Sequence, residues 1–114
     1  MFTSELARQI YEVATLFARN TKSLSTVLLV GGTDVDTDLA RCEQGCSIVV
    51  GTPGRVHDIL HRADGPSTKN CEVLVMDEAD TLLDLGFQQT INHILQLLPK
   101  QRRTGLFSAT QVRN

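Results

Sequence analysis

The 114-residue chain has no tryptophan, few aromatic residues (4%) and three cysteines without a CxxC pair. Without large aromatic side chains, a core must be built mainly from leucine, isoleucine, valine and alanine. The hydrophobic fraction of 41% is enough for such a core and exceeds that of disordered chains. A small, odd number of cysteines argues against a disulfide scaffold and favours a reducing, intracellular compartment.

Long apolar runs and an excess of one charge are also missing. No run approaches the ~20 residues of a membrane span, and the N-terminus lacks the basic-then-apolar layout of a signal peptide. We therefore expect no membrane partner. Eleven basic and thirteen acidic residues give a net charge of -2. That balance excludes a broad electrostatic coating of nucleic acid but is compatible with a local phosphate site.

What the chain does have is a regular alternation of apolar strand patterns with amphipathic helix patterns. The alternation predicts strands over residues 25–30, 47–50, 71–76 and 103–107, and helices over 4–20, 34–44, 55–62 and 87–98. The first two strands are short, mainly apolar runs, as strands buried on both faces are. This order predicts an α/β fold, with a parallel sheet and flanking helices.

Unusual residues follow each predicted strand directly. They are Gly31-Gly32, Thr52-Pro53-Gly54-Arg55, Asp77-Glu78-Ala79-Asp80 and Ser108-Ala109-Thr110. In open parallel sheets, ligands bind beyond the carboxyl ends of the strands. These four segments are therefore the candidate functional residues.

The acidic segment after the third strand fits a nucleotide–metal site. Three carboxylates within four residues repel one another unless a cation or hydrogen-bond donors compensate. Mg²⁺ prefers one or two carboxylates plus water and phosphate oxygens. Asp77 can thus hold a Mg²⁺-nucleotide and Glu78 can orient an attacking water, although a solvated strand end is the alternative. Ser108 and Thr110 can donate to a carboxylate of this segment, or they can cap a turn.

The two earlier segments have the properties of a phosphate site. Gly54 lets a ligand approach the backbone, the start of a helix favours phosphate, and Arg55 can grip a phosphate as a fork. Gly31-Gly32 exposes backbone N–H groups in the same way. Ordinary turn chemistry is the alternative for both segments.

In order and spacing, the four segments resemble the first RecA-like domain of DEAD-box ATP-dependent RNA helicases. Asp77-Glu78-Ala79-Asp80 spells the motif that names this family, and the resemblance covers essentially the whole chain. Residues 98–111 are most similar to the branch that assembles the large ribosomal subunit. The resemblance implies ATP and Mg²⁺ as cofactors, single-stranded or duplex RNA as a sequence-independent partner, and a nuclear or nucleolar location.

The resemblance also implies a role for each matching residue. Asp77 would coordinate Mg²⁺-ATP through water, and Glu78 would polarise the hydrolytic water. Asp80 would meet Ser108 and Thr110, which couple hydrolysis to strand separation. The residues implied to contact the RNA backbone are Thr3, Glu5, Gly31, Gly32, Thr52, Gly54 and Arg55.

Two departures from the family pattern limit what this chain can do. Ser4 stands where the family has a phosphate-gripping arginine, and a hydroxyl cannot replace a charged fork. The sequence also holds no G-x-x-x-x-G-K-[ST] loop, whose backbone and lysine hold the phosphates. We therefore expect residues 1–114 to be a partial N-terminal RecA-like domain, without the strand that precedes this loop. We expect it to hydrolyse no ATP alone and to need a second RecA-like domain.

Two further hypotheses stay open at this point. The chain could be a non-catalytic module that binds RNA or a protein, or a gene-model or splice fragment without a role of its own. We also expect the missing strand to leave an apolar edge that makes the chain prone to aggregate.

Overall fold

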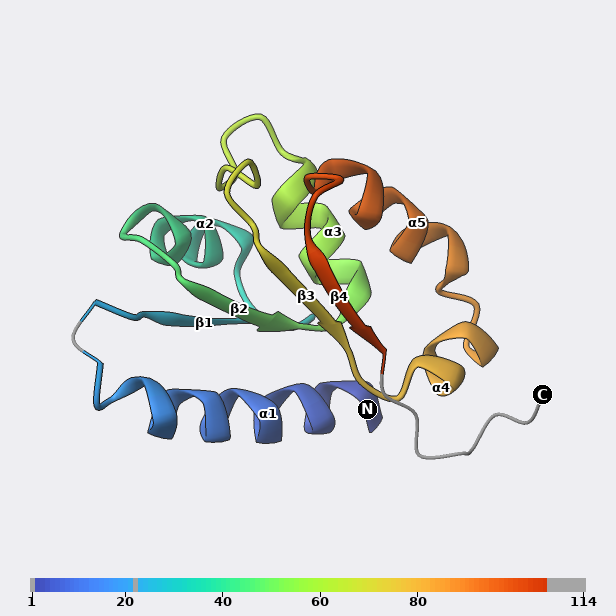
Figure 1. The fold of residues 1–114 in the computed structure, drawn as a ribbon, viewed down its shortest axis with the longest axis horizontal. Helices are drawn as coiled ribbons and strands as arrows, with labels where there is room; N and C mark the ends of the chain where they lie inside the picture. The colour runs from blue at the N-terminus through green and yellow to red at the C-terminus, as the bar shows by residue number, and fades with distance from the viewer. Residues whose placement is uncertain (1, 22, 107–114) are drawn as a thin grey trace. The chain divides into compact units, whose positions relative to one another are not determined.

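The computed structural model describes residues 2–21 and 23–106, and within them it leaves undescribed the side chains of Phe2, Thr3, Ala79, Asp80 and Leu106. The chain divides into two compact units, residues 1–66 and 67–114, and each is described by itself. Helices and strands alternate through both (Figure 1).

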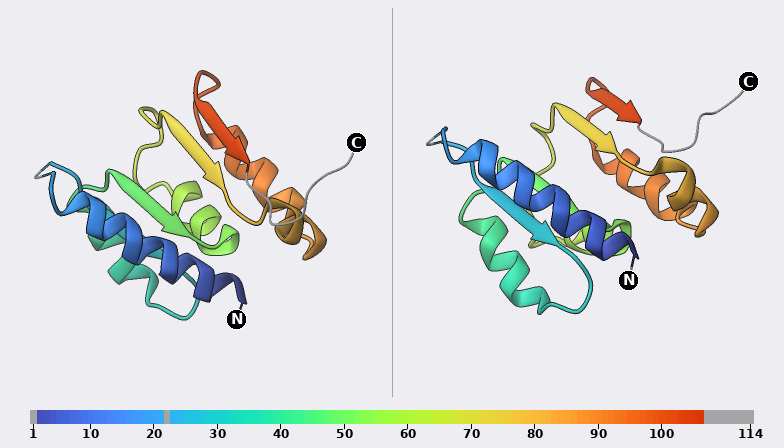
Figure 2. Two further views of the ribbon diagram at one scale, coloured as in Figure 1. Left: turned by 60° about the horizontal axis from the view of Figure 1, so that its bottom comes forward. Right: turned by 90° about the horizontal axis from the view of Figure 1, so that it is seen from below.

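The first unit contains two strands and three helices. They are α1 (Phe2–Ala18), β1 (Thr26–Leu29), α2 (Val35–Glu43), β2 (Ile48–Gly51) and α3 (Pro53–His61). The strands pair in parallel, with Thr26 opposite Ile48 and Leu29 opposite Gly51. Helix α1 covers one face of this pair, while α2 and α3 cover the opposite face (Figures 1 and 2).

Alternation along β1 explains this layering. Val27 and Leu29 point to one face and pack with Cys42 of α2 and Ile59 of α3 in a buried cluster. Thr26 points to the other face, where its hydroxyl lies 2.9 Å from the hydroxyl of Thr15 in α1. Since successive residues of a strand face opposite ways, each side of β1 receives its own helix layer.

Local sequence sets the starts of α2 and α3. Asp34 caps α2 by accepting hydrogen bonds from the backbone N–H and the hydroxyl of Thr37, at 3.2 and 3.0 Å. Helix α3 opens with Pro53, whose fixed φ and missing N–H suit a first helical position. This is why α3 begins two residues before the predicted start at Arg55.

The second unit repeats the strand–helix–strand order. It contains β3 (Val73–Met76), α4 (Ala79–Asp84), α5 (Gln88–Leu97) and β4 (Arg103–Leu106). Strands β3 and β4 pair in parallel, with Met76 opposite Leu106. Gly86, at φ +87°, separates the two helices. Along β3 the burial alternates, so that Val73 and Val75 are 57% and 56% exposed.

The structure confirms the predicted α/β class with parallel strands and flanking helices. The prediction that β2 is buried on both faces was wrong, because Val49 is 37% exposed and the other three residues are half-buried. All three cysteines are free thiols. Among the described residues, no helix is long and apolar enough to cross a membrane.

Candidate functional site

The turns after β1 and β2 start from one edge of the first sheet. Leu29 and Gly51 are register partners at the ends of these strands, and the N–H of Thr52 donates to the carbonyl of Leu29 at 3.0 Å. Gly31-Gly32 and Thr52–Arg55 therefore begin side by side. The first turn of α1 lies at the same edge (Figures 1 and 2), and it carries Glu5, which is exposed.

The glycines of this edge fall into two kinds. A Cβ at Gly51 would clash with the carbonyl oxygen of Leu29 and would lie 2.6 Å from Cγ2 of Val56, so Gly51 is required by packing. A Cβ at Gly31 or Gly54 would meet no atom of the described chain within 4 Å. Nothing inside the unit explains the missing side chains of Gly31 and Gly54, and their backbone is open to a ligand.

The start of α3 adds hydrogen-bond donors to this edge. The first N–H groups of a helix have no acceptor within it, and the helix dipole makes this end favourable for anions. Thr52 occupies the N-cap, yet its hydroxyl makes no capping hydrogen bond. That hydroxyl and the neighbouring N–H groups are the kind of donor that a phosphate accepts from.

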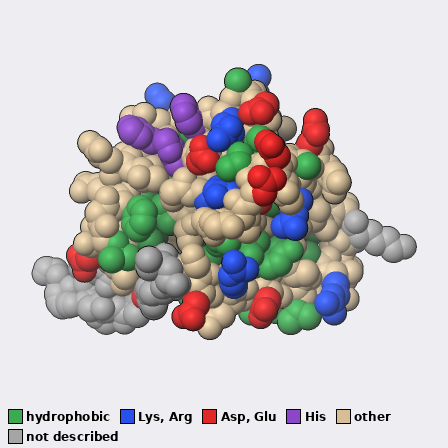
Figure 3. All heavy atoms as spheres, turned by 180° about the vertical axis from the view of Figure 1, so that it is seen from behind, with side chains coloured by type: hydrophobic (Ala, Val, Ile, Leu, Met, Phe, Trp, Pro, Cys, Tyr) green, Lys and Arg blue, Asp and Glu red, His purple; other side chains and the backbone are tan. Residues whose placement is uncertain are grey.

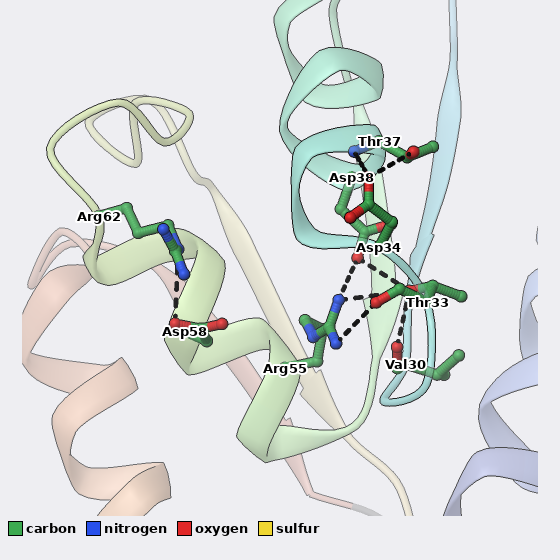
Figure 4. Close-up of polar contacts among 8 residues, drawn as sticks. All are labelled: Val30, Thr33, Asp34, Thr37, Asp38, Arg55, Asp58 and Arg62. Atoms are coloured by element: carbon green, nitrogen blue, oxygen red, sulfur yellow. Dashed lines mark hydrogen bonds and ion pairs between the residues drawn. The ribbon is translucent and has the colours of Figure 1, made fainter.

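Arg55 does not extend freely from this turn. Its Nη1 donates to Oδ2 of Asp38 at 2.7 Å, and its Nη2 donates to the carbonyl oxygen of Thr33 at 3.0 Å (Figure 4). The hydroxyl of Thr33 lies 3.1 Å from the same carboxylate oxygen and 3.0 Å from the carbonyl oxygen of Val30. One guanidinium thus joins the start of α3, the turn after β1 and the side of α2.

Asp38 is the residue that sequence reasoning missed. Its side chain is 0% exposed and that of Arg55 is 13% exposed, so this is a buried ion pair. Oδ1 of Asp38 has no hydrogen-bond partner among the described residues. Its spacing could have indicated this burial. Asp38 follows Val35 by three residues and precedes Cys42 by four, so it lies on the apolar stripe of α2.

The buried carboxylate also affects its neighbour on α2. Burial raises the pKa of the Cys42 thiol to about 11, and the nearby Cys46 thiol and Asp38 carboxylate add to the shift. Cys42 is therefore a neutral thiol at physiological pH, which makes it a packing residue rather than a nucleophile.

Exposed charges elsewhere in the first unit are paired more weakly. Asp58 of α3 and Arg62, the C-cap residue of that helix, form an ion pair at 3.5 Å, with side chains 41% and 39% exposed (Figure 4). Lys, Arg, Asp and Glu side chains are interspersed on the face drawn in Figure 3, in keeping with the near-neutral composition.

The acidic segment lies at the corresponding edge of the second sheet. Because Met76 pairs with Leu106, strands β3 and β4 end at the same edge. Oδ1 of Asp77 accepts the N–H of Glu78 at 2.9 Å, and the hydroxyl of Thr81 lies 3.5 Å from Oε1 of Glu78. Glu78 has φ +55°, a left-handed conformation that non-glycine residues adopt at a cost.

A divalent cation is compatible with these donors when a nucleotide supplies the others. No group of three or more metal-ligating side chains occurs among the described residues. Mg²⁺, however, needs only one or two carboxylates when phosphate oxygens and water complete its shell. Asp77 offers a carboxylate at the strand end, and its Oδ1 accepts the N–H of the next residue.

Part of the predicted site falls outside the structure. Ser108 and Thr110 lie outside the described residues, as do the side chains of Thr3 and Asp80. The predicted link from Asp80 to the two hydroxyls therefore stays a prediction, supported by the shared strand edge.

The chain is similar to proteins of one known family. The model of the DEAD/DEAH box helicase family matches residues 2–114. The chain belongs to this family. It is 51% identical over 110 residues to DEAD-box ATP-dependent RNA helicase 18 of Arabidopsis thaliana, covering 96% of this chain and 18% of that protein. It is 50% identical over 115 residues to ATP-dependent RNA helicase DDX55 of Homo sapiens, covering 96% and 19%. The chain thus spans about a fifth of the length of these curated relatives.

Proposed function

We propose that this DEAD-box chain is part of an ATP-dependent RNA helicase, which couples ATP hydrolysis to RNA unwinding. Its β1–β2 edge holds the RNA backbone, and its β3–β4 edge presents the acids for hydrolysis. Family membership supports the activity, and the relatives are named as ATP-dependent RNA helicases.

One observation carries the RNA-binding half of the proposal. Gly31 and Gly54 leave open space on neighbouring turns, and no packing within the unit accounts for them. Backbone N–H groups at such turns can donate hydrogen bonds to the phosphates of any strand, because phosphates carry no sequence information. Residues assigned to this contact are Thr3, Glu5, Gly31, Gly32, Thr52, Gly54 and Arg55.

The second edge supplies the groups that act on the nucleotide. Asp77 would hold Mg²⁺ through water, and the cation would neutralise charge on the phosphates of bound ATP. Glu78 would orient the water that attacks. Asp80 would contact Ser108 and Thr110, and this contact would couple hydrolysis to strand separation.

The 114 residues do not suffice for hydrolysis. They contain no G-x-x-x-x-G-K-[ST] loop, so nothing in them holds the β- and γ-phosphates as that loop does. A second RecA-like domain, with its own arginines, completes the ATP site in this proposal.

RNA binding is tested by fluorescence anisotropy with a labelled single-stranded oligouridylate at about 50 mM salt. We expect Gly31→Ala and Gly54→Ala each to weaken binding roughly threefold to tenfold, because a methyl group blocks the approach of the phosphate. Arg62→Ala is the matched control, since it removes an exposed positive charge at the other end of α3. Equal binding by wild type and both glycine variants would refute the site.

Hydrolysis is tested by release of inorganic phosphate from ATP, with and without RNA. We expect the wild-type 114-residue chain to release no more than a double variant carrying Asp77→Asn and Glu78→Gln. RNA-stimulated release above this control would show that the chain assembles an ATP site without the phosphate loop.

The open glycine turns are equally compatible with a second candidate, a non-catalytic module that binds RNA or a protein. RNA binding without hydrolysis is expected of both, so complementation by a second RecA-like domain carrying the loop separates them. A role in ribosome biogenesis and a nuclear or nucleolar location are also proposed. They are supported by the similarity of residues 98–111 to the branch that assembles the large ribosomal subunit.

A further inference from the structure

The contacts of Arg55 conflict with a simple role as a phosphate ligand. A guanidinium that grips phosphate from solvent should be exposed, whereas this side chain is 13% exposed. Two of its nitrogens are already occupied, one by the carboxylate of Asp38 and one by the carbonyl oxygen of Thr33.

The charges of Asp38 and Arg55 explain why the two side chains stay paired. A buried carboxylate is costly unless a cation and hydrogen bonds compensate. Asp38 has one such cation, Arg55, and the hydroxyl of Thr33 lies 3.1 Å from the same oxygen. Because both partners of Asp38 sit on the two RNA-binding turns, removing the carboxylate would release both turns together.

The pair also connects three elements that local sequence does not connect. Asp38 and Arg55 are 17 positions apart, and Thr33 and Arg55 are 22 apart. Thr33 directly follows Gly32, which has φ +90°, and a turn with glycines at two successive positions has much backbone freedom to lose. The bond from Arg55 to the carbonyl of Thr33 removes part of that freedom before any RNA arrives.

We propose that Asp38 is a positioning residue for the RNA site, and that Arg55 acts mainly through it. In this inference, which rests on the proposed RNA-binding function, the pair fixes the Gly31-Gly32 turn against the start of α3. The phosphates are then held by backbone N–H groups whose spacing the pair has set in advance, which lowers the ordering cost of binding.

The test combines RNA affinity with its salt dependence, for the variants Asp38→Asn, Arg55→Ala and the two together. We expect each single variant to weaken oligouridylate binding roughly tenfold. The double variant should bind no more weakly than either single variant, since each substitution already breaks the same ion pair. We expect the slope of log K against log salt to stay unchanged in Arg55→Ala. A direct phosphate ligand would lose about 1 from that slope, and Asp38→Asn would then bind as well as wild type or better.

Two further variants guard against a simple loss of folding. Thr33→Val removes one hydroxyl from an exposed residue, and it should weaken binding in the same direction with an unchanged melting temperature. Asp58→Asn breaks the exposed ion pair of α3 and should change neither affinity nor stability. An effect of Asp58→Asn as large as that of Asp38→Asn would overturn the inference.

Hydrogen exchange without RNA separates this inference from the proposed function. Amides of residues 31–34 and 52–56 should exchange faster in Asp38→Asn than in Asp58→Asn, if the pair orders both turns. Failure of the wild-type chain to bind RNA would contradict the proposed function, yet faster exchange would still support the positioning role. Equal exchange in the two variants would overturn it, whatever the RNA affinity.

Discussion

The two units share one plan, a parallel strand pair joined through helices, but they cover their strands differently. In the first unit helices lie on both faces of the pair, and Leu29 and Ile59 are fully buried. In the second, Val73 and Val75 leave one face of β3 more than half exposed. Parallel strands are apolar because both faces are normally covered, so the second unit presents an apolar face that the described residues do not cover.

The units also treat their acidic residues differently. The first buries Asp38 against Arg55 and uses the pair to join three elements. The second leaves Asp77 and Glu78 at a strand end, and there the N–H of Glu78 and the hydroxyl of Thr81 are the hydrogen-bond partners that the described residues offer them. A paired, buried acid positions its neighbours, whereas an acid without a cation is available to a ligand that brings one.

The largest expected effect is the difference in stability loss when a strand side chain is truncated in the first sheet and in the second. Leu29→Ala should lower the free energy of unfolding by about 2–5 kcal/mol, because it leaves a cavity in a fully buried site. Val75→Ala in β3 should cost less than about 0.5 kcal/mol, because that residue is already 56% exposed. Urea titrations followed by circular dichroism measure both. Equal losses would mean that both faces of β3 are covered in solution.

The next effect separates the two kinds of glycine at the first edge. Gly51→Ala should cost about 1–3 kcal/mol, because its methyl group would clash with the backbone of Leu29. Gly54→Ala meets open space and should change stability by less than about 0.5 kcal/mol. Thermal melts of the two variants against wild type decide this. A destabilised Gly54→Ala would give that glycine a structural role and weaken its assignment to RNA.

The pH dependence tests the buried face of α2. The pKa of Cys42 is raised from 9.0 to about 11 in the folded chain, so the folded state holds this proton more tightly than the unfolded state does. Its contribution to stability is therefore complete below pH 9 and is lost as the pH rises towards 11, by on the order of 2 kcal/mol. Unfolding of Cys42→Ala should lack this loss. An identical alkaline profile in both proteins would contradict the burial of the thiol.

The smallest expected effect concerns the strained residue of the second edge. Glu78→Gly should raise the free energy of unfolding by about 1 kcal/mol relative to Glu78→Ala, because glycine adopts φ +55° without strain. Comparing glycine with alanine separates the backbone effect from the lost side chain. A less stable glycine variant would place Glu78 in an ordinary helical conformation in solution.

Much of the fold was predictable because its signals are local. Apolar runs predicted the four strands, and Gly86 lies at the break between α4 and α5, whereas α3 begins two residues before its predicted start. The exposure of Val73 and Val75 could not be predicted, because a sequence pattern shows that a strand is apolar but not what covers it.

The sequence predicted where the candidate site residues lie in the fold, but it did not predict which side chains they contact. Sequence order placed the glycine turns at one strand edge and the acids after β3, as observed. The burial of Asp38 could not be predicted, because an acidic residue in the first turn of α2 is typical of an exposed helix start. The ion pair that accompanies this burial is made with Arg55, 17 positions away. For the same reason the contacts of the Arg55 guanidinium with Asp38 and Thr33 could not be predicted.

The division of labour between the two edges is tested most directly by mapping where RNA binds. Oligouridylate titrated into the ¹⁵N-labelled 114-residue chain should shift the backbone amide signals of Gly31, Gly32, Gly54 and Arg55 first. Signals of Asp77 and Glu78 should stay in place. Shifts centred on residues 77–80, or spread evenly over the lysines and arginines, would contradict the account.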